Sequence, residues 1–509
     1  MPVSIVPLQG FATGTDTDNH AGPTRHIIAD RIRMRLTFWG AAQQVTGSMF
    51  LLEQGDYKIL IDCGLDMSRE RRQDDYVPTW EPAYEGALFP FDASTVSCVL
   101  LTHAHLDHSG MLPNLVRAGF EGQIYCTAPT RELTTILLYD SANLHTKKAK
   151  ALGQKKTKDK AAAQQYNELY FADHVDEVMD RFQQVSLDKP FQLTDTIKVC
   201  FYTAGHLLGA GSIYMEVTEG QQVKRIGFSG DLGRYNYPLL ADPAPFPEVD
   251  YLICESTYGN RYHTDKGDPV DIMQDVIQRT CVDIPGRLLI PAFSIGRTQA
   301  ILYTLNRLYT ERGFEPIKVF SDSPMALQST KVFTKYQHQL NGQARKFGQE
   351  HNHLFDFENF EFVADPDKSK AINDYNEPCI IISSSGMIKG GRIEYHVKRN
   401  IENPYATIFI VGFAPEGTLS HSLIQGQDKI FNEGKEYKVR ANIERTDIFS
   451  GHADLNGLLK FVGQQDKQSL KHVFLVHGDK EPMLDFAAKL REEGYAGVTA
   501  PAPGEAFEL

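Results

Sequence analysis

Short apolar runs of strand length recur along this chain, and six of them are followed at their C-terminal end by a side chain that can bind a metal ion. The six side chains are those of Asp62, His103, His206, Asp231, Glu255 and His477. Taken alone, each could instead be a histidine whose hydrogen bonds are satisfied inside the core, or an acidic residue that caps a helix. Because the relation is repeated, the pattern indicates strands that deliver their terminal side chains to one edge of a sheet.

The densest group of such side chains lies in the segment 102–108, Thr-His-Ala-His-Leu-Asp-His. Neutral imidazole and carboxylate are the ligands that a catalytic zinc ion prefers. His103 and His105 can face one ion, and Asp107 and His108, one turn further on, can face a second. A histidine-rich surface loop is the alternative, but the chain has only 17 histidines in 509 residues, and an ordered H-x-H-x-D-H set favours a metal site.

A different pattern begins near residue 259 and continues to about residue 445. Strand-like runs alternate there with helical stretches, which is typical of a parallel α/β sheet. The runs are residues 287–290, 317–320, 379–382 and 407–411. Residues 131–183, by contrast, are predicted to be helical and charged.

Several motifs together resemble a known family. The H-x-H-x-D-H set, with an upstream Asp62, a later His206 and Asp231 and a C-terminal His477, resembles the metallo-β-lactamase superfamily. Three features are similar to its β-CASP branch, which processes nucleic acids. They are Glu255 in Cys-Glu-Ser-Thr-Tyr-Gly, His452 in Phe-Ser-Gly-His-Ala-Asp, and His477 in Val-His-Gly-Asp. The closest likeness is to RNA nucleases related to the endonuclease subunit of the cleavage and polyadenylation specificity factor, in their compact prokaryotic form.

This resemblance covers about residues 34 to 509, and residues 291–297 and 383–387 also share it. It implies an α/β fold, in which an αββα metallo-β-lactamase sandwich carries an inserted parallel α/β β-CASP domain. The sandwich would be formed by residues 34–258 and 446–509, and the insertion by residues 259–445. Residues 1–33 would be an N-terminal extension.

The resemblance also implies a site that holds two Zn²⁺ ions per chain. His103, His105, His206 and Asp231 would hold one ion, and Asp107, His108, His477 and again Asp231 would hold the other. A carboxylate that bridges two ions places them about 3.5–4 Å apart, and a hydroxide that they share is a nucleophile near neutral pH. Asp62 would accept a hydrogen bond from a ligand imidazole and fix its tautomer.

Three residues are assigned catalytic roles by the same resemblance. His452 is the candidate general acid for the leaving 3′-oxygen, and Glu255 would orient it and raise its pKa. Asp107 would serve both as a ligand and as part of the catalytic set. A structural pair at the domain junction is the alternative interpretation of Glu255 and His452.

Candidate phosphate- and RNA-binding residues lie where strands run into helices in the inserted segment. Ser294 and Arg297, and likewise Ser384 and Ser385, stand at turns whose following helix offers free N–H groups. A simple tight turn is the alternative at both places. The lysine cluster between Lys147 and Lys160 is either a solvated face or a basic rim that attracts RNA phosphates.

Charge and cysteine content limit the partners and the compartment. The formal net charge of −13 opposes general attraction to nucleic acid, so RNA must be held by local cations and by the metals. Seven cysteines without a CxxC pair indicate a reducing compartment, and we expect a cytoplasmic protein. No apolar run reaches the length of about 18 residues that a membrane span needs, so no membrane partner is expected. The oligomeric state is open, with a homodimer among the options.

The predicted function is a zinc-dependent ribonuclease that hydrolyses single-stranded RNA, as an endonuclease, a 5′→3′ exonuclease or both, in RNA processing or decay. A DNA nuclease of the same branch is the alternative, but DNA-directed members carry an apolar residue where this chain has His477. A small-molecule hydrolase is less favoured because that class lacks the insertion and the Glu255/His452 pair. An inactive scaffold is disfavoured because every ligand is retained.

Overall fold

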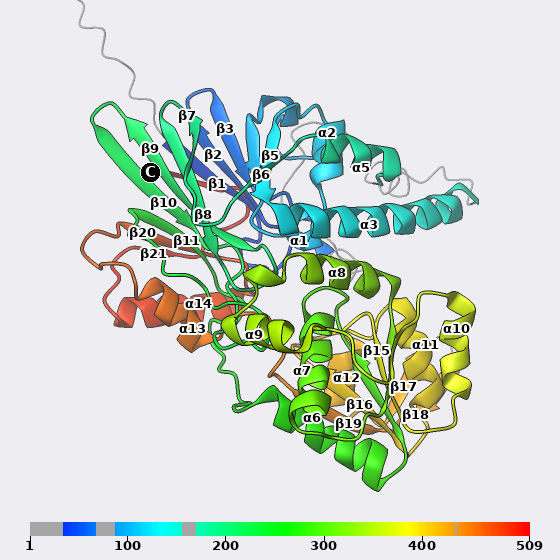
Figure 1. The fold of residues 1–509 in the computed structure, drawn as a ribbon. Helices are drawn as coiled ribbons and strands as arrows, with labels where there is room; N and C mark the ends of the chain where they lie inside the picture. Colours follow the sequence, from blue (N-terminus) through cyan, green and yellow to red (C-terminus); the bar gives the residue numbers. More distant parts are fainter. Residues whose placement is uncertain (1–33, 68–86, 155–168, 433–434) are drawn as a thin grey trace, which may run out of the picture.

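The structure is a computed structural model that describes residues 34–67, 87–154, 169–432 and 435–509. The predicted extension 1–33 and four of the clustered lysines, Lys155, Lys156, Lys158 and Lys160, lie outside the described residues. The described strands form two seven-stranded sheets, one six-stranded sheet and a two-stranded hairpin. Figure 1 shows the two larger sheets stacked in one part of the molecule and the six-stranded sheet in the other.

The first sheet has the strand order β22-β1-β2-β3-β4-β5-β6. Its strands are β1 (Met34–Gly40), β2 (Met49–Gln54), β3 (Tyr57–Ile61), β4 (Cys98–Leu100), β5 (Gln123–Thr127), β6 (Phe182–Val185) and β22 (Glu505–Glu508). Strands β3 to β6 are parallel, so their C-terminal ends share one edge. Asp62 follows β3 at this edge, and His103 lies shortly after β4.

The second sheet has the order β21-β20-β11-β10-β9-β8-β7. Its strands are β7 (Phe191–Thr194), β8 (Ile197–Thr203), β9 (Gly211–Glu219), β10 (Gln222–Phe228), β11 (Tyr251–Glu255), β20 (His472–Val476) and β21 (Val498–Thr499). Strands β10, β11 and β20 are parallel, and β8 runs the same way because β9 is antiparallel to both β8 and β10. Asp231, Glu255 and His477 therefore lie at the ends of neighbouring parallel strands.

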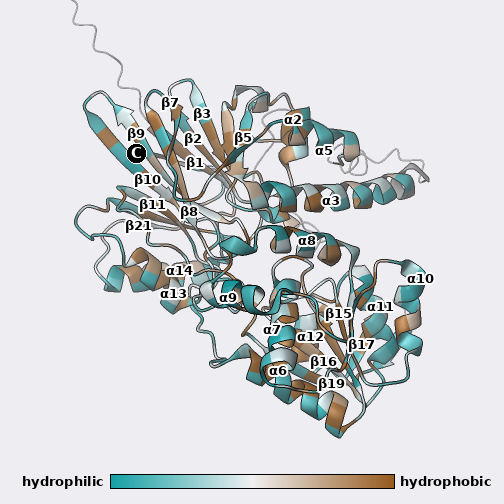
Figure 2. Ribbon diagram, viewed as in Figure 1, coloured by the Kyte–Doolittle hydropathy of each residue, from teal (hydrophilic) through white to brown (hydrophobic). Residues whose placement is uncertain are grey.

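The inner faces of these two sheets pack into one hydrophobic core, in which the rings of Phe38 and Phe474 lie 5.2 Å apart. Helices α2 (Leu112–Arg117), α3 (Ala128–Gln154) and α5 (Ala172–Met179) cover the outer face of the first sheet. Helices α13 (Leu455–Val462) and α14 (Lys480–Glu492) cover the second. Figure 2 shows hydrophobic strands between helices with hydrophilic outer faces. The predicted αββα sandwich is confirmed.

The third sheet has the order β14-β13-β15-β12-β16-β19, and all of its strand pairs are parallel. Its strands are β12 (Arg287–Pro291), β13 (Lys318–Asp322), β14 (Phe360–Phe362), β15 (Cys379–Ser383), β16 (Ala406–Val411) and β19 (Asn442–Thr446). Its helices are α6 (Pro269–Ile277), α7 (Arg297–Glu311), α8 (Pro324–Lys335), α9 (Gly342–His351), α10 (Pro366–Ala371), α11 (Gly391–Asn400) and α12 (Leu419–Ile424). Helices α6 to α9 pack on one face, and α11 and α12 pack on the other. The inserted parallel α/β sheet is thus confirmed.

Some elements were not predicted. Strand β14 has only three residues, and β19 reads Asn-Ile-Glu-Arg-Thr, with polar side chains at most positions because it lies at the sheet edge. The stretch 131–183, predicted to be helical, contains α3 and α5 but ends in strand β6. The hairpin β17 (Lys429–Asn432) and β18 (Lys435–Lys438) was also missed. No helix among the described residues is both long and apolar enough to span a membrane.

Candidate metal centre and active site

Four donor atoms converge in a first group at the C-terminal edge of the sandwich. The Nδ1 atom of His105 lies 3.1 Å from the Nε2 atoms of both His103 and His206. The Oδ2 atom of Asp231 lies 3.5 Å and 3.6 Å from those same Nε2 atoms. Ligands about 2.0–2.1 Å from a tetrahedral zinc ion are about 3.3 Å apart, so this group has the dimensions of a zinc site.

A second group shares Asp231 with the first. The Oδ1 atom of Asp231 lies 3.2 Å from His108 Nε2 and 3.5 Å from His477 Nε2. The Oδ2 atom of Asp107 lies 3.5 Å from the same His477 nitrogen. One oxygen of Asp231 thus faces each group, which is the arrangement of a carboxylate that bridges two metal ions.

Two buried atoms of this cluster have no hydrogen-bond partner among the described residues. They are Asp231 Oδ1 and His477 Nε2. A buried polar atom that is left unsatisfied costs about 1–3 kcal/mol, and more when it is charged. A cation held within the second group would satisfy both atoms, so the residues fit a metal centre by their own chemistry.

The protonation states of the first group also suit metal binding, which requires neutral imidazoles and ionised carboxylates. Burial lowers the pKa of His105 to about 4, and it lowers the pKa of His103 and His206 well below their ordinary value. Burial opposes the charged form of Asp231, but the nearby His108 and His477 hold the pKa of its carboxyl group well below the usual range. The group is therefore ready to bind a cation at neutral pH.

Three of the five ligand imidazoles are oriented by a contact that their other nitrogen makes. His108 Nδ1 donates to Asp62 Oδ2 at 2.7 Å, and His206 Nδ1 donates to the carbonyl oxygen of Gly451 at 3.1 Å. His477 Nδ1 faces the Thr257 hydroxyl oxygen at 3.0 Å. These bonds fix the tautomers and leave Nε2 free for a metal.

Asp62 is itself held in place by two further hydrogen bonds. It accepts bonds of 2.8 Å from the backbone N–H and from the hydroxyl group of Thr102. Asp62 and His477 also have positive φ angles, 59° and 49°, which are uncommon for residues other than glycine. Backbone strain of this kind is typical of functional sites. Thr102, Thr257 and the Gly451 carbonyl were missed from the sequence; only the adjacency of Thr102 to His103 could have signalled one of them.

Glu255 and His452 form a pair beside both donor groups. His452 Nδ1 lies 3.3 Å from Glu255 Oε1, and Glu255 is fully buried. The ring of His452 lies 4.4 Å from that of His206 and 5.8 Å from that of His477. Burial lowers the pKa of His452, but the carboxylates of Glu255, Asp231 and Asp107 together outweigh burial, and the net shift is upward. His452 is thus placed to carry a proton next to the metal groups.

Two of the candidate phosphate-binding serines lie together, and the third does not. Ser294 and Ser384 lie 2.9 Å and 3.4 Å from the hydroxyl oxygen of Ser323, at the C-terminal ends of β12, β15 and β13. Ser385 is directed away and donates to the Lys389 carbonyl oxygen at 2.8 Å. Ser323 was not predicted, although it caps α8.

Arg297, the first residue of α7, extends toward the loop that carries His452. Its Nε atom donates to the carbonyl oxygen of Phe449 at 3.1 Å, and its guanidinium group lies over the ring of Phe293 at 5.0 Å. Gly412, at φ +148°, makes room for this guanidinium, because a Cβ atom there would lie 2.7 Å from Arg297 Cζ. Of the lysine cluster, Lys147, Lys148 and Lys150 are exposed near the end of α3.

Family models match three parts of the chain. Residues 51–223 match a metallo-β-lactamase superfamily domain, residues 298–423 match a β-CASP domain, and residues 436–501 match a Zn-dependent metallo-hydrolase RNA specificity domain. Ribonuclease TTHA0252 of Thermus thermophilus is 31% identical over 463 residues, which cover 91% of this chain and 97% of that protein. The chain belongs to the β-CASP branch of the metallo-β-lactamase superfamily.

Other relatives agree with this assignment. An RNase J-like protein of Methanocaldococcus jannaschii is 28% identical, over 89% of this chain and 94% of its own length. The transcription termination factor FttA of Methanosarcina mazei is 29% identical, over 90% of this chain and 69% of its own length. A crystal structure of a protein of unknown function from Enterococcus faecalis shares the fold, with a TM-score of 0.51, 14% identity and coverage of 94% of this chain and 100% of that one.

The two donor groups predict the metal content. We expect the purified protein to contain about two zinc ions per chain by elemental analysis, because the donors form two groups that share Asp231. His103→Ala should lower this number to about one. His338→Ala, which changes a histidine on a short 3-10 helix away from the cluster, is the matched control and should leave it unchanged. A full complement of zinc in His103→Ala would contradict the assignment of the first group.

The Glu255–His452 pair predicts a shift in pH dependence. The negative charge of Glu255 raises the pKa of His452, so Glu255→Gln should lower that pKa while it keeps the side-chain shape. A general acid acts only when it is protonated, so the basic limb of the pH–rate profile should move to lower pH. Glu361→Gln, on strand β14, is the control and should leave the profile unchanged. An unmoved basic limb in Glu255→Gln would show that His452 is not the acid.

Proposed function

We propose that this chain is a zinc-dependent ribonuclease that hydrolyses phosphodiester bonds of single-stranded RNA. The observation that carries the proposal is the position of the Glu255–His452 pair directly beside two donor groups that share one carboxylate. A metal centre can activate water and polarise a phosphoryl oxygen, and an adjacent proton donor can protonate the leaving oxygen of a phosphodiester. The relatives described as a ribonuclease and as RNase J-like support RNA as the substrate.

Zinc bound by these residues would supply Lewis-acid chemistry, which polarises a phosphoryl oxygen and makes water a usable nucleophile near neutral pH. The chain itself would supply the proton. In this proposal His452 donates it to the 3′-oxygen that leaves, and Glu255 holds the imidazole in position through Nδ1. Asp107, whose Oδ2 atom faces His477, would act mainly as a ligand.

Arg297 is the strongest candidate for holding the RNA backbone. Its guanidinium group has no carboxylate partner in the ranges that the structure describes, and burial lowers its pKa. A partly buried guanidinium group without a counter-ion is costly unless a substrate anion binds to it. We propose that one RNA phosphate binds there, and that Ser294, Ser384 and Ser385 belong to the same phosphate-binding face.

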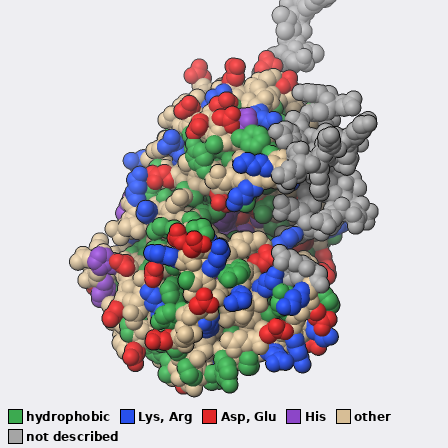
Figure 3. All heavy atoms as spheres, turned by 90° about the vertical axis from the view of Figure 1, so that its right-hand side faces the viewer, with side chains coloured by type: hydrophobic (Ala, Val, Ile, Leu, Met, Phe, Trp, Pro, Cys, Tyr) green, Lys and Arg blue, Asp and Glu red, His purple; other side chains and the backbone are tan. Residues whose placement is uncertain are grey.

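We propose that a single strand, and not a duplex, enters the space between the two parts of the molecule. Figure 3 shows the molecule hollowed between its upper and lower parts, with histidine side chains inside the hollow. Lys and Arg side chains border it together with Asp and Glu, which agrees with a net charge of −13 and with attraction by a few local cations. His477, in place of an apolar residue, favours RNA over DNA.

We also propose a cellular compartment for the protein and the ways in which it cuts RNA. All seven cysteines are buried free thiols, which supports a reducing compartment such as the cytoplasm. The prediction for the mode of action is endonuclease action, 5′→3′ exonuclease action or both. A homodimer is among the options for the oligomeric state.

The choice of substrate is tested with end-labelled oligonucleotides. Purified protein should cut single-stranded RNA faster than single-stranded DNA of the same sequence, and duplexes of either kind poorly. Product mapping over time also separates internal cuts from stepwise removal at the 5′ end. A preference for DNA would reject RNA as the substrate and support the DNA-nuclease alternative.

The proton donor is tested by changing the leaving group. His452→Ala should retain its zinc but lose activity on RNA by about 10²–10⁴-fold, the usual contribution of a well-placed general acid. On a nitrophenyl phosphodiester, whose leaving group needs no proton, the loss should be much smaller. His263→Ala, which removes a neighbouring imidazole that contacts the His452 carbonyl oxygen, Asp447 and the ring of Tyr258, is a useful comparison. Equal losses of His452→Ala on both substrates would assign His452 a different role.

A further inference from the structure

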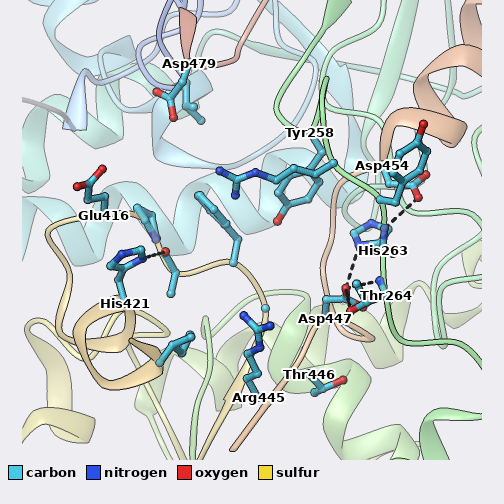
Figure 4. Close-up of a pocket in the computed structure, with 18 of the residues that line it drawn as sticks. Tyr258, His263, Thr264, Glu416, His421, Arg445, Thr446, Asp447, Asp454 and Asp479 are labelled. Carbon is cyan, nitrogen blue, oxygen red and sulfur yellow. Dashed lines mark hydrogen bonds and ion pairs between the residues drawn. The ribbon is translucent and has the colours of Figure 1, made fainter. Parts of the chain in front are cut away.

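The large cavity between the sandwich and the inserted sheet, shown in Figure 4, belongs to the site that is proposed to bind RNA. The inserted sheet also has an opposite end, where its strands begin (Figure 1). Four neighbouring strands start there in register. Their paired first residues are Lys318 of β13, Cys379 of β15, Arg287 of β12 and Ala406 of β16.

The loops that precede these four strands form one surface. Strands in a sheet are about 4.8 Å apart, so the four loops extend over about 15 Å. This distal surface comprises residues 282–286, 313–317, 374–378 and 402–405.

Contacts between the loops hold the distal surface in place. The N–H of Arg287 donates to the carbonyl oxygen of Tyr405 at 3.1 Å, and its guanidinium group donates to the carbonyl oxygens of Asn373 and Tyr375. A Cβ atom at Gly286 would lie 1.9 Å from the Tyr405 carbonyl oxygen, so the two loops are in close contact. Each loop also contains one proline, whose ring fixes φ. They are Pro285, Pro316, Pro378 and Pro404. A surface that is already ordered loses less entropy when a partner binds.

Large apolar side chains are exposed on the distal surface. Val282, Ile284 and Tyr405 are exposed by 47%, 49% and 63%. Pro285 and Pro404 beside them are also exposed. Figure 3 shows hydrophobic side chains at the lower end of the molecule, away from the hollow. Exposed apolar side chains that gather in one place mark an interaction site, because burial against a partner removes them from water.

The charge on the distal surface is of one sign. Its four loops contain five carboxylates and no Lys, Arg or His. The carboxylates are those of Asp283, Glu315, Asp374, Glu377 and Glu402, and all five residues are exposed. None of them forms an ion pair within the described residues, and the bonds that three of them accept come from uncharged groups. Two cations stand at the first positions of the strands, but Arg287 is held by backbone carbonyl oxygens and Lys318 by Glu361.

This combination of apolar and acidic groups selects the kind of partner. The carboxylates repel RNA phosphates and anionic lipids, so neither fits the surface. A second copy that presented the same surface would bring two sets of carboxylates together without cations between them. A protein that carries apolar side chains surrounded by Lys and Arg complements both features.

We propose that the distal surface binds a partner protein through an apolar segment flanked by basic residues. In the complex, apolar side chains of the partner cover Val282, Ile284 and Tyr405, and its Lys and Arg side chains pair with the carboxylates of the four loops. The metal centre stays accessible, because it lies beyond the opposite end of the inserted strands. The inference concerns a second surface and does not depend on the proposed ribonuclease function.

The test uses the full chain and two sets of short synthetic peptides, whose Leu and Phe residues are flanked by Lys and Arg in one set and by Asp and Glu in the other. Fluorescence anisotropy should show binding of the basic set, weaker as salt is added, and no binding of the acidic set. Ile284→Ser and Tyr405→Ser should each weaken binding about tenfold through the loss of buried apolar area. Glu377→Lys combined with Glu402→Lys should reverse the preference between the two sets.

Leu484→Ser is the matched control, because it removes a side chain that is 48% exposed on α14 in the sandwich. It should bind the peptides like the unmodified protein, and thermal unfolding of every variant should show an intact fold. The proposal is rejected if no basic peptide binds, if both sets bind equally well, or if Leu484→Ser loses as much affinity as Tyr405→Ser. Sedimentation that shows self-association lost in Tyr405→Ser would assign the surface to a second copy and also reject it.

Cleavage assays separate this surface from the RNA site. Ile284→Ser and Tyr405→Ser should cut RNA at the unmodified rate. Slower cutting by either variant would make the surface part of the RNA site and overturn the proposal. An unmodified protein that does not cut RNA contradicts the ribonuclease function and leaves the result with the peptides unchanged.

Discussion

One buried carboxylate, that of Asp231, is the constraint on which the rest of the structure depends. Its two oxygens each face a different group of donors, so six further side chains must approach within hydrogen-bond range of one another. Only a framework that ends several strands at the same place can do this. Both sheets of the sandwich contribute, with β3 and β4 from one and β8, β10, β11 and β20 from the other. The hydrophobic core between the sheets sets their separation and so fixes the distance between the two sets of donors.

Such a cluster opposes folding in the absence of a cation, because burial removes water from imidazoles and carboxylates that cannot satisfy each other. Hydrogen bonds made by the imidazole nitrogens that face away from the two donor groups offset part of this cost of burial. Asp62 links His108 to Thr102, and the Gly451 carbonyl oxygen and the Thr257 hydroxyl hold two other imidazoles. The positive φ angles of Asp62 and His477 are a further cost in backbone conformation at the same cluster. Metal binding would then contribute to folding stability as well as to chemistry.

The apolar pattern was sufficient to predict the inserted sheet and a convergence of donors, because six of the candidate side chains follow strand-like runs. The sandwich was predicted through the family resemblance that these residues carry. The sequence was not sufficient for features carried by the backbone. The carbonyl oxygens of Gly451 and Phe449, which meet His206 and Arg297, have no signature in residue type. Ser323 completes a hydroxyl cluster only after β13 is placed beside β15. The polar edge strand β19 was missed for the same reason, since its position depends on pairing with β16 and not on its own pattern.

The loop between β19 and α13 explains how the inserted sheet can influence chemistry in the sandwich. Within six residues, Asp447 pairs with Arg234, Phe449 accepts from Arg297, Gly451 orients His206 and His452 contacts Glu255. A shift of the inserted sheet relative to the sandwich would therefore move a metal ligand and the candidate acid together. An RNA strand that contacts both Arg297 and Arg445, which lies at the end of β19 directly before this loop, would hold the loop in one position. Binding and proton transfer would then be coupled through a single short segment, and the general repulsion from a net charge of −13 would be overcome only by a strand that reaches these cations.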